Sequence, residues 1–157
     1  MTAVVLTGCN TRKTDNKTEP SGNTAQLELS AVEESKAMAE GEVNYLTTAD
    51  FKRRVMDFEA NPDKWVFEGK RPAVIDFYTE WCGPCKALMP TIEEIAIEYA
   101  EKIKVVKIDV DRNENLAVKY GIMSIPALLF FVNGKPEKSL IGVQSKEKIE
   151  KTIRKFL

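Results

Sequence analysis

The sequence predicts an α/β domain in which helices cover both faces of a central, mixed β-sheet. Two patterns support this prediction. From residue 43 to the C-terminus, short apolar runs alternate with stretches of helical period. The last two apolar runs flank Asn133-Gly134, a dipeptide typical of a hairpin turn, so the final two strands are expected to be antiparallel. A length of 157 residues, 43% of them hydrophobic, suits one packed domain with an appendage.

The domain is expected to begin with a short strand and a helix. Val43 to Leu46 has the composition of an edge strand. Thr48 is placed to cap a helix that runs from about Ala49 to Ala60. Asn61-Pro62-Asp63 is expected to break that helix.

A buried strand and a long helix follow. Ala73 to Tyr78 is apolar apart from Asp76, which is typical of a strand covered on both faces. A helix-like stretch runs from Lys86 to Glu101. Its apolar residues recur at helical spacing, at Leu88, Ile92, Ile95 and Tyr99.

The second half of the domain is expected to contain three more strands and two more helices. They are a strand from Ile103 to Val110, a short helix from Leu116 to Tyr120, strands from Ala127 to Val132 and from Glu137 to Val143 around the turn Asn133-Gly134-Lys135-Pro136, and a last helix, capped by Ser145, that ends at Phe156.

The most informative motif is Trp81-Cys82-Gly83-Pro84-Cys85, which places two thiols three residues apart. A strand that leads through Cys-x-x-Cys into a helix is the setting of a dithiol redox site. Cys82 is expected to be exposed at the helix N-terminus, where free N–H groups and the helix dipole favour a thiolate and make it the nucleophile. Cys85 is expected one turn inside, where it can attack a mixed disulfide on Cys82. Pro84 suits the first helical turn because it has no N–H to leave unpaired.

Other uses of a Cys-x-x-Cys pair fit this chain poorly. A structural zinc site needs about four ligands, and the chain has three cysteines and no histidine. Haem attachment needs a histidine after the second cysteine, where this chain has Lys86. A permanent structural disulfide with so short a loop would constrain the unfolded chain little. We therefore expect thiol chemistry with no metal and no cofactor. A net charge of −1 without a basic run also gives no reason to expect binding to nucleic acid.

From about Tyr45 to Leu157 the chain resembles the thioredoxin family. Val74 to Lys86 resembles the active-site segment of that family almost residue for residue, with Tyr78 where thioredoxins often carry Trp. Three later segments match as well: Gly121 to Pro126 resembles the segment with the family's cis-proline, Phe130 to Lys135 its hairpin, and Gly142 its late glycine. The resemblance implies a thioredoxin fold and the reduction of protein disulfides.

Two charged residues inside predicted strands are further candidates for the chemistry. The apolar neighbours of Asp76 favour its burial, which raises a carboxyl pKa. The resemblance implies that Asp76 lies behind the dithiol and helps to deprotonate Cys85, the resolving thiol. Lys107 resembles the lysine that neighbours this aspartate in the family. The alternative for Lys107 is a strand residue whose ammonium reaches solvent.

The resemblance also implies a substrate platform around the dithiol. The Ile125–Pro126 bond is expected to be cis and to face the dithiol, leaving the backbone of Ile125 free to pair with an extended substrate segment. Trp81 is expected to be partly exposed and to surround the site together with Ile125 and the loop at Gly121-Ile122. The remaining residues that we place at this platform are Gly83, Pro84 and Gly142.

Three functions compete for this sequence. The leading one is a monomeric protein-disulfide reductase that serves electron transport and cell redox homeostasis. A cell-envelope disulfide oxidase or isomerase is an alternative, although Gly83-Pro84 resembles reducing thioredoxins and DsbA-type oxidases commonly carry Pro-His there. A thioredoxin-like binding adaptor is the other alternative, against which the presence of both cysteines and Asp76 argues. The resemblance implies two classes of electron donor: a thioredoxin reductase in the cytoplasm, or a membrane dithiol relay in the cell envelope.

The first 42 residues are expected to stand apart from the domain at residues 43–157. No aromatic residue precedes Tyr45, and residues 10–42 are polar, which predicts a flexible tether. Met1 to Cys9 ends in Leu-Thr-Gly-Cys, which resembles the lipobox of bacterial lipoproteins, but no Lys or Arg precedes it. We interpret residues 1–9 as a truncated signal segment. The resemblance implies a lipid on Cys9 and a place in the bacterial cell envelope or periplasm; the alternative is a cytoplasmic protein with a chance cysteine.

Overall fold

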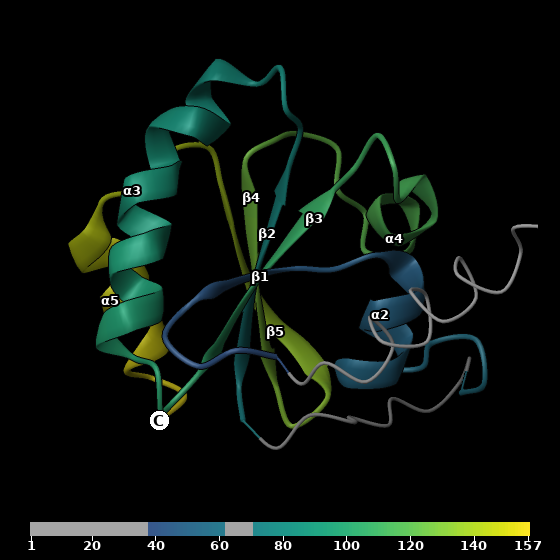
Figure 1. Ribbon diagram of the computed structural model, residues 1–157, viewed down its shortest axis with the longest axis horizontal. Helices are drawn as coiled ribbons and strands as arrows, with labels where there is room; N and C mark the ends of the chain where they lie inside the picture. Colours follow the sequence, from purple (N-terminus) through teal and green to yellow (C-terminus); the bar gives the residue numbers. More distant parts are fainter. Residues whose placement is uncertain (1–37, 62–70) are drawn as a thin grey trace, which may run out of the picture. The chain divides into compact units, whose positions relative to one another are not determined.

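A five-stranded mixed sheet forms the centre of the protein in a computed structural model that describes residues 38–61 and 71–157 (Figure 1). The strands lie in the order β1-β3-β2-β4-β5. The first three are parallel to one another, and β4 and β5 are antiparallel to their neighbours. The elements are β1 (Val43–Tyr45), α2 (Thr48–Arg54), β2 (Ala73–Tyr78), α3 (Gly83–Glu98), β3 (Lys104–Asp109), α4 (Glu114–Lys119), β4 (Ala127–Val132), β5 (Lys135–Ile141) and α5 (Lys146–Ile153). None of the helices in these described ranges has the length and apolar character needed to cross a membrane.

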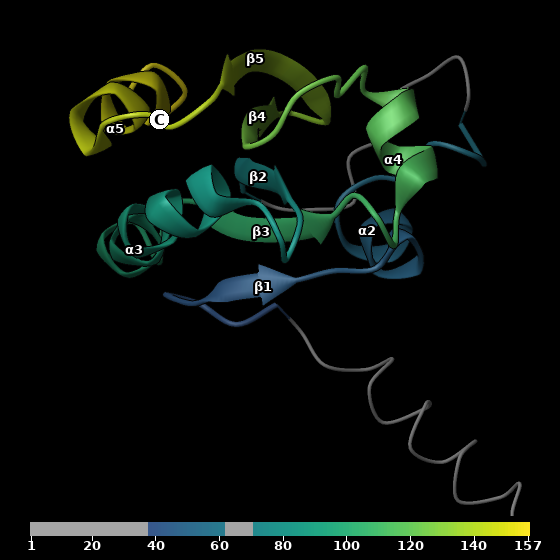
Figure 2. The same ribbon diagram turned by 90° about the horizontal axis from the view of Figure 1, so that it is seen from above.

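Alternate side chains of the sheet supply two apolar cores, one on each face. Figure 2 shows the sheet nearly edge-on, with α3 and α5 toward one side and α2 and α4 toward the other. Along β2, Ile75 and Phe77 pack into the core that includes Phe51 of α2 and Leu116 of α4. Val74 packs instead into the core of α3 and α5. The predicted architecture of a mixed sheet covered on both faces is therefore confirmed.

The same alternation places two charged side chains beneath α3. Asp76 follows Val74 by two residues and Lys107 follows Val105 by two residues. Because side chains two apart on a strand share a face, both charges face the core of α3 and α5. They are also register partners on the neighbouring strands β2 and β3.

Helix α2 differs from its prediction at both ends. Its N-cap is Thr47, not Thr48: the Thr47 hydroxyl accepts from the Asp50 N–H, and the Asp50 carboxylate accepts in return from the Thr47 N–H. The helix stops at Arg54, six residues before the predicted end. The reason is Asp57, whose carboxylate accepts from the N–H groups of two following residues and so closes a separate turn.

The hairpin turn is shorter than predicted. Asn133 and Gly134 both have positive φ, at 50° and 77°, as a two-residue turn of the hairpin type requires. Strand β5 therefore begins at Lys135, two residues before the expected start, and includes Pro136. A proline is tolerated there because β5 is the edge strand of the sheet.

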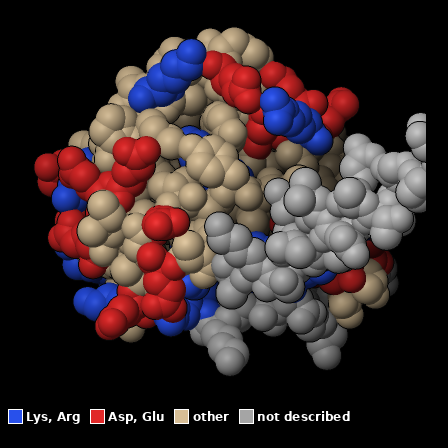
Figure 3. Space-filling model, in the orientation of Figure 1, with Lys and Arg blue, Asp and Glu red and all other residues tan. Residues whose placement is uncertain are grey.

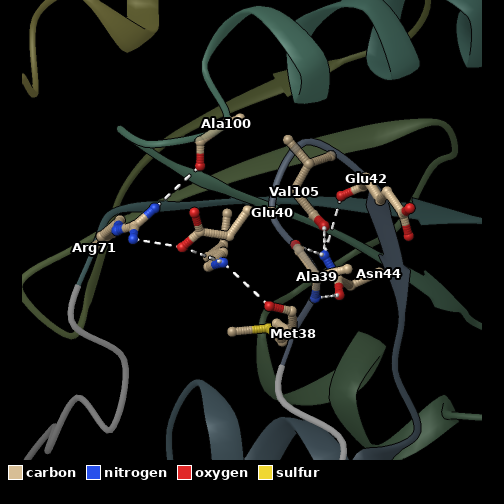
Figure 4. A network of polar contacts seen from close by, with 9 residues as sticks. Met38, Ala39, Glu40, Glu42, Asn44, Arg71, Ala100 and Val105 are labelled. Carbon is tan, nitrogen blue, oxygen red and sulfur yellow. Dashed lines mark hydrogen bonds and ion pairs between the residues drawn. The ribbon is translucent and has the colours of Figure 1, made fainter.

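The chain approaches β1 through a set of polar contacts that we call the entry clamp, formed by residues 38–44 with Arg71 and Lys104 (Figure 4). The Asn44 side chain holds the turn before β1: its oxygen accepts from the Ala39 N–H at 2.8 Å, and its NH₂ donates to the Ala39 carbonyl at 3.1 Å. The same NH₂ also reaches the Val105 carbonyl of β3, at 3.3 Å.

A second part of the entry clamp is ionic. The Glu40 carboxylate lies 2.5 Å from Arg71 and 3.4 Å from Lys104. Arg71 also donates to the Ala100 carbonyl, and Lys104 to the Met38 carbonyl. Residues 38–42, which were predicted to belong to the tether, thus contact the sheet at the end where β1 begins. The other predicted tether residues, 10–37, and the segment 1–9 lie outside the described residues.

Candidate active site

The two cysteines of the Cys-x-x-Cys motif meet where β2 passes into α3. Cys82 is the N-cap of α3, and Pro84 lies in the first helical turn, as predicted. Cys82 and Cys85 form a disulfide, with their Cα atoms 5.3 Å apart. The Cys82 sulfur also accepts the backbone N–H of Cys85 at 3.2 Å, so it occupies the position of a capping oxygen. A negative charge on that sulfur would meet the positive end of the helix dipole.

Cys82 is less exposed than the sequence predicts, with 5% of its surface accessible. Its sulfur turns inward because it is bonded to Cys85 and accepts that residue's N–H. The residues around it, Trp81, Gly83 and Pro84, are all exposed, and Trp81 reaches 72%. These exposed residues surround the disulfide, and Cys85 is the deeper of the two cysteines at 2%.

Asp76 and Lys107 form a buried ion pair on the α3 face of the sheet. Lys107 Nζ lies 2.6 Å from Asp76 Oδ2, and the two residues are 2% and 0% exposed. Asp76 Oδ1 has no hydrogen-bond partner among the described residues. Burial raises the pKa of the Asp76 carboxyl above its usual range, and the Lys107 charge opposes that rise. The predicted burial of Asp76 is confirmed, and the alternative that Lys107 reaches solvent is wrong.

A pocket of about 380 Å³ lies beside Cys85, on the side of the sheet that carries the ion pair. Its lining residues are Tyr45, Tyr78, Thr79, Glu80, Cys85, Lys86, Met89 and Lys107. The sequence did not predict that Tyr45, Thr79 and Met89, which come from three separate segments, line a common pocket. In Figure 3 most charged side chains lie around the periphery of the face shown, and uncharged surface covers its middle, where Figure 1 places β1.

A larger groove, of about 500 Å³, begins at Trp81. Its lining residues are Trp81, Val110, Asp111, Glu114, Ala117, Val118, Ile122, Met123, Ser124 and Ile125. The indole N–H of Trp81 donates to the Asp111 carboxylate at 2.7 Å, which fixes the ring at the mouth of the groove. The structure thus brings Trp81, Ile122 and Ile125 together as expected. Sequence reasoning missed Asp111, whose only signal was its place just after a strand end.

The remaining predicted platform residues lie at the start of β4 and the end of β5. The Ile125–Pro126 peptide bond is cis, as predicted. The Pro126 carbonyl accepts the N–H of Gly142 at 2.8 Å, so these two predicted residues are neighbours. Ile125 is half-buried and lines the groove, whereas Pro126 is buried. Cys9, the predicted lipidation residue, lies outside the described residues.

The arrangement supports a two-step transfer of electrons through sulfur. One cysteine stands at a helix N-terminus, where a thiolate is favoured. The second lies within disulfide distance of it, so it can displace any sulfur bound to the first. A buried carboxylate with a raised pKa lies on the same face of the sheet and is a candidate proton acceptor.

Comparison with known proteins gives one consistent result. The family profile described as Thioredoxin matches residues 42–155. A thioredoxin from Borreliella burgdorferi is 40% identical over 112 residues, which are 71% of this chain and 94% of that protein. A thioredoxin from Alicyclobacillus acidocaldarius is 43% identical over 90 residues, which are 57% of this chain and 86% of that protein.

A solved structure shows the same fold. A mutant thioredoxin from Halobacterium salinarum NRC-1 superposes with a TM-score of 0.61 at 27% identity. The match covers 77% of this chain and 96% of that one. The five-stranded mixed sheet with helices on both faces is therefore a thioredoxin fold, as the sequence predicts.

Proposed function

We propose that this chain, which belongs to the thioredoxin family of thiol–disulfide oxidoreductases, reduces protein disulfides in the bacterial cell envelope, held at a membrane through Cys9. The reductase activity is that of the family. The observation that carries it is the Cys82–Cys85 pair at disulfide distance at the N-terminus of α3. The location and the anchor rest on the sequence around Cys9.

The reaction consumes one disulfide of the substrate and leaves one on this chain. The Cys82 thiolate attacks a substrate sulfur, the substrate S–S bond breaks, and the leaving sulfur takes a proton from solvent. The Cys85 thiol then gives its proton to the Asp76 carboxylate and attacks the Cys82 sulfur. The second substrate sulfur leaves as a thiolate and takes a proton from solvent, and Asp76 releases the proton that it accepted. Two electrons have then passed to the substrate. The product form is the Cys82–Cys85 disulfide seen in the structure.

Recovery of the dithiol requires an electron donor. In the cell envelope this donor is a membrane dithiol relay, which would exchange its own dithiol with the Cys82–Cys85 disulfide. The substrates are proteins with accessible disulfides, and the groove at Trp81 receives the chain next to the substrate sulfur. A cytoplasmic thioredoxin reductase is the donor if the protein stays inside the cell.

Insulin reduction by the purified protein, with dithiothreitol as donor, tests the activity directly. Precipitation of the insulin B chain should require both Cys82 and Cys85. A protein that has free thiols but does not reduce insulin would instead be an adaptor that uses the fold for binding alone.

The anchor at Cys9 is tested in cells that express the gene with its full upstream sequence. The native protein should fractionate with membranes and incorporate labelled palmitate, because two or more acyl chains give lasting attachment. Cys9→Ala should be soluble and unlabelled, with insulin reduction unchanged. A native protein that is soluble and unlabelled would eliminate the anchor, and mass spectrometry of its N-terminus would then show whether a signal segment had been removed.

A further inference from the structure

The buried ammonium of Lys107 is held from two sides. Asp76 Oδ2 lies 2.6 Å from its Nζ, and the centroid of the Tyr78 ring lies 4.2 Å from the same atom. Lys107 is 2% exposed, so water does not surround the charge. The face of an aromatic ring attracts a cation, and most strongly where water is excluded. The Tyr78 ring is therefore a second attractive contact for the ammonium, in addition to the carboxylate.

The ring of Tyr78 is itself fixed in place. Tyr45 packs against it edge-on, with the ring centroids 6.1 Å apart and the planes at 78°. The Tyr45 hydroxyl donates to the Met89 sulfur of α3 at 4.0 Å. The contacts thus run from α3 through Tyr45 and Tyr78 to Lys107, all of which line the pocket beside Cys85, and from Lys107 to the buried Asp76.

We propose that Tyr78 is a positioning residue for thiol–disulfide exchange, whose ring holds the Lys107 ammonium against Asp76 and so keeps that carboxylate ready to accept the proton of Cys85. This inference rests on the role proposed above for Asp76. It assigns the aromatic ring at position 78 an electrostatic task in addition to packing.

The effect on Asp76 follows from the two opposing influences on its carboxyl. Burial raises the pKa of Asp76, and the Lys107 charge lowers it. Without the ring, the ammonium can swing into the pocket of about 380 Å³, away from the carboxylate. The pKa of Asp76 would then rise further, and less of the carboxylate would be ionised at a given pH. The other titratable and charged groups around this site are Tyr45 of β1, Glu80 after β2, Cys85, Lys86 and Glu93 of α3, Asp109 of β3 and Arg112 after β3.

Two substitutions at position 78 distinguish the effect of the aromatic π face from the effects of apolar packing and of the hydroxyl group. Tyr78→Leu keeps an apolar side chain but has no π face, and Tyr78→Phe keeps the π face and loses only the hydroxyl. The first measurement follows the Asp76 carboxyl carbon by NMR against pH in the full-length oxidised protein. Tyr78→Leu should raise its midpoint by about one pH unit, and Tyr78→Phe should restore the wild-type midpoint.

The second measurement is the pH dependence of insulin reduction. In Tyr78→Leu the acidic limb of the pH–rate profile should move to higher pH by the same amount as the Asp76 midpoint. At high pH the variant should reach the wild-type rate. Circular dichroism and the thermal midpoint show that each variant is folded. An Asp76 midpoint that stays at the wild-type value in folded Tyr78→Leu would overturn the inference.

The two measurements also separate this inference from the proposed role of Asp76. A shifted Asp76 titration with an unshifted rate profile would support the positioning by Tyr78 and remove Asp76 from the mechanism. A slow rate at every pH in Tyr78→Leu, with the Asp76 titration unchanged, would show that the ring acts through packing alone and would contradict the proposal.

Discussion

Asp76 and Lys107 are register partners on adjacent parallel strands, and their charged atoms lie 2.6 Å apart in a region that is almost closed to solvent. Burying two charges is costly, and their mutual attraction offsets this cost only in part. Asp76 Oδ1 also lacks a partner among the described residues. A pair placed this way contributes little to stability, which is consistent with a role in proton transfer beside Cys85.

Exchanging the two cysteines separately for serine should give different outcomes. Cys82→Ser should abolish insulin reduction, because the attacking sulfur is lost. Cys85→Ser should instead accumulate mixed disulfides between Cys82 and its substrates, because the resolving attack is lost. Non-reducing gel electrophoresis with mass spectrometry of the trapped species measures this. Stable complexes on Cys82→Ser rather than on Cys85→Ser would reverse the assignment.

Asp76→Asn should slow insulin reduction most at neutral pH and below. There the Cys85 thiol is hardest to deprotonate, so a local base matters most. At high pH, hydroxide replaces the carboxylate and the variant should approach the wild-type rate. Stopped-flow measurement of the exchange step across pH tests this. A profile parallel to that of the wild type would remove Asp76 from the mechanism.

The same substitution should change stability in a pH-dependent way. Because the folded-state pKa of Asp76 is raised above 3.8, the folded protein holds this proton more tightly than the unfolded chain does. The stability contribution of the protonated carboxyl is complete below the unfolded pKa and is lost as pH rises through the folded pKa. Between these two values the wild type should lose about 1.4 kcal/mol per pH unit relative to Asp76→Asn.

Urea unfolding of both oxidised proteins at a series of pH values measures that difference. Below the unfolded pKa the gap between the two should be constant, since both side chains are then neutral. If the wild type gained stability relative to Asp76→Asn with rising pH, the folded pKa would be lowered rather than raised. Such a result would make the Lys107 charge, and not burial, the dominant influence on the carboxyl.

Asp111→Ala should weaken binding of protein substrates without unfolding the domain. It removes the acceptor at 2.7 Å from the Trp81 indole, and the ring at the groove mouth loses its fixed orientation. Loss of one such hydrogen bond should raise the KM for insulin roughly two- to tenfold, with kcat nearly unchanged. Asp111→Asn keeps an acceptor oxygen and is the matched control. Equal KM values for Asp111→Ala and the wild type would exclude Asp111 from substrate binding.

Several features that depend on residues close together in the sequence were predicted correctly. The strand before Cys82, the helix after it and the burial of Asp76 all follow from local apolar pattern. Thr48 was predicted to cap α2, but the cap is Thr47, because Asp50 stands three positions after Thr47 and completes a capping box with it. The early end of α2 depends on hydrogen bonds accepted by the Asp57 side chain, and the periodicity of apolar residues does not predict such bonds.

Contacts between distant segments were not predictable in the same way. Asp111 meets Trp81 across 30 residues, and Tyr45 meets Tyr78 across 33. Taken singly, Asp111 after a strand and Tyr45 on an edge strand give no sequence signal of a functional role. Their roles depend on the order β1-β3-β2, which brings the ends of three separate strands to one edge of the sheet. The burial of Cys82 was missed for a related reason, because it depends on which way the sulfur turns.

The end of the sheet at which the chain enters, held by the entry clamp, determines how this domain would carry a pulling force between residue 38 and Cys82. A chain held at residue 38 and joined to a substrate through Cys82 is pulled from opposite ends, because β1 begins where β2 begins and Cys82 follows the end of β2. The force then runs along the strands, and the backbone hydrogen bonds between β1, β3 and β2 bear it in shear, all at once. The side-chain contacts of Asn44 and Glu40 share the load at the point where the chain enters. With the proposed anchor on the N-terminal side of residue 38 and a mixed disulfide at Cys82, the domain would resist extension rather than peel open from its edge.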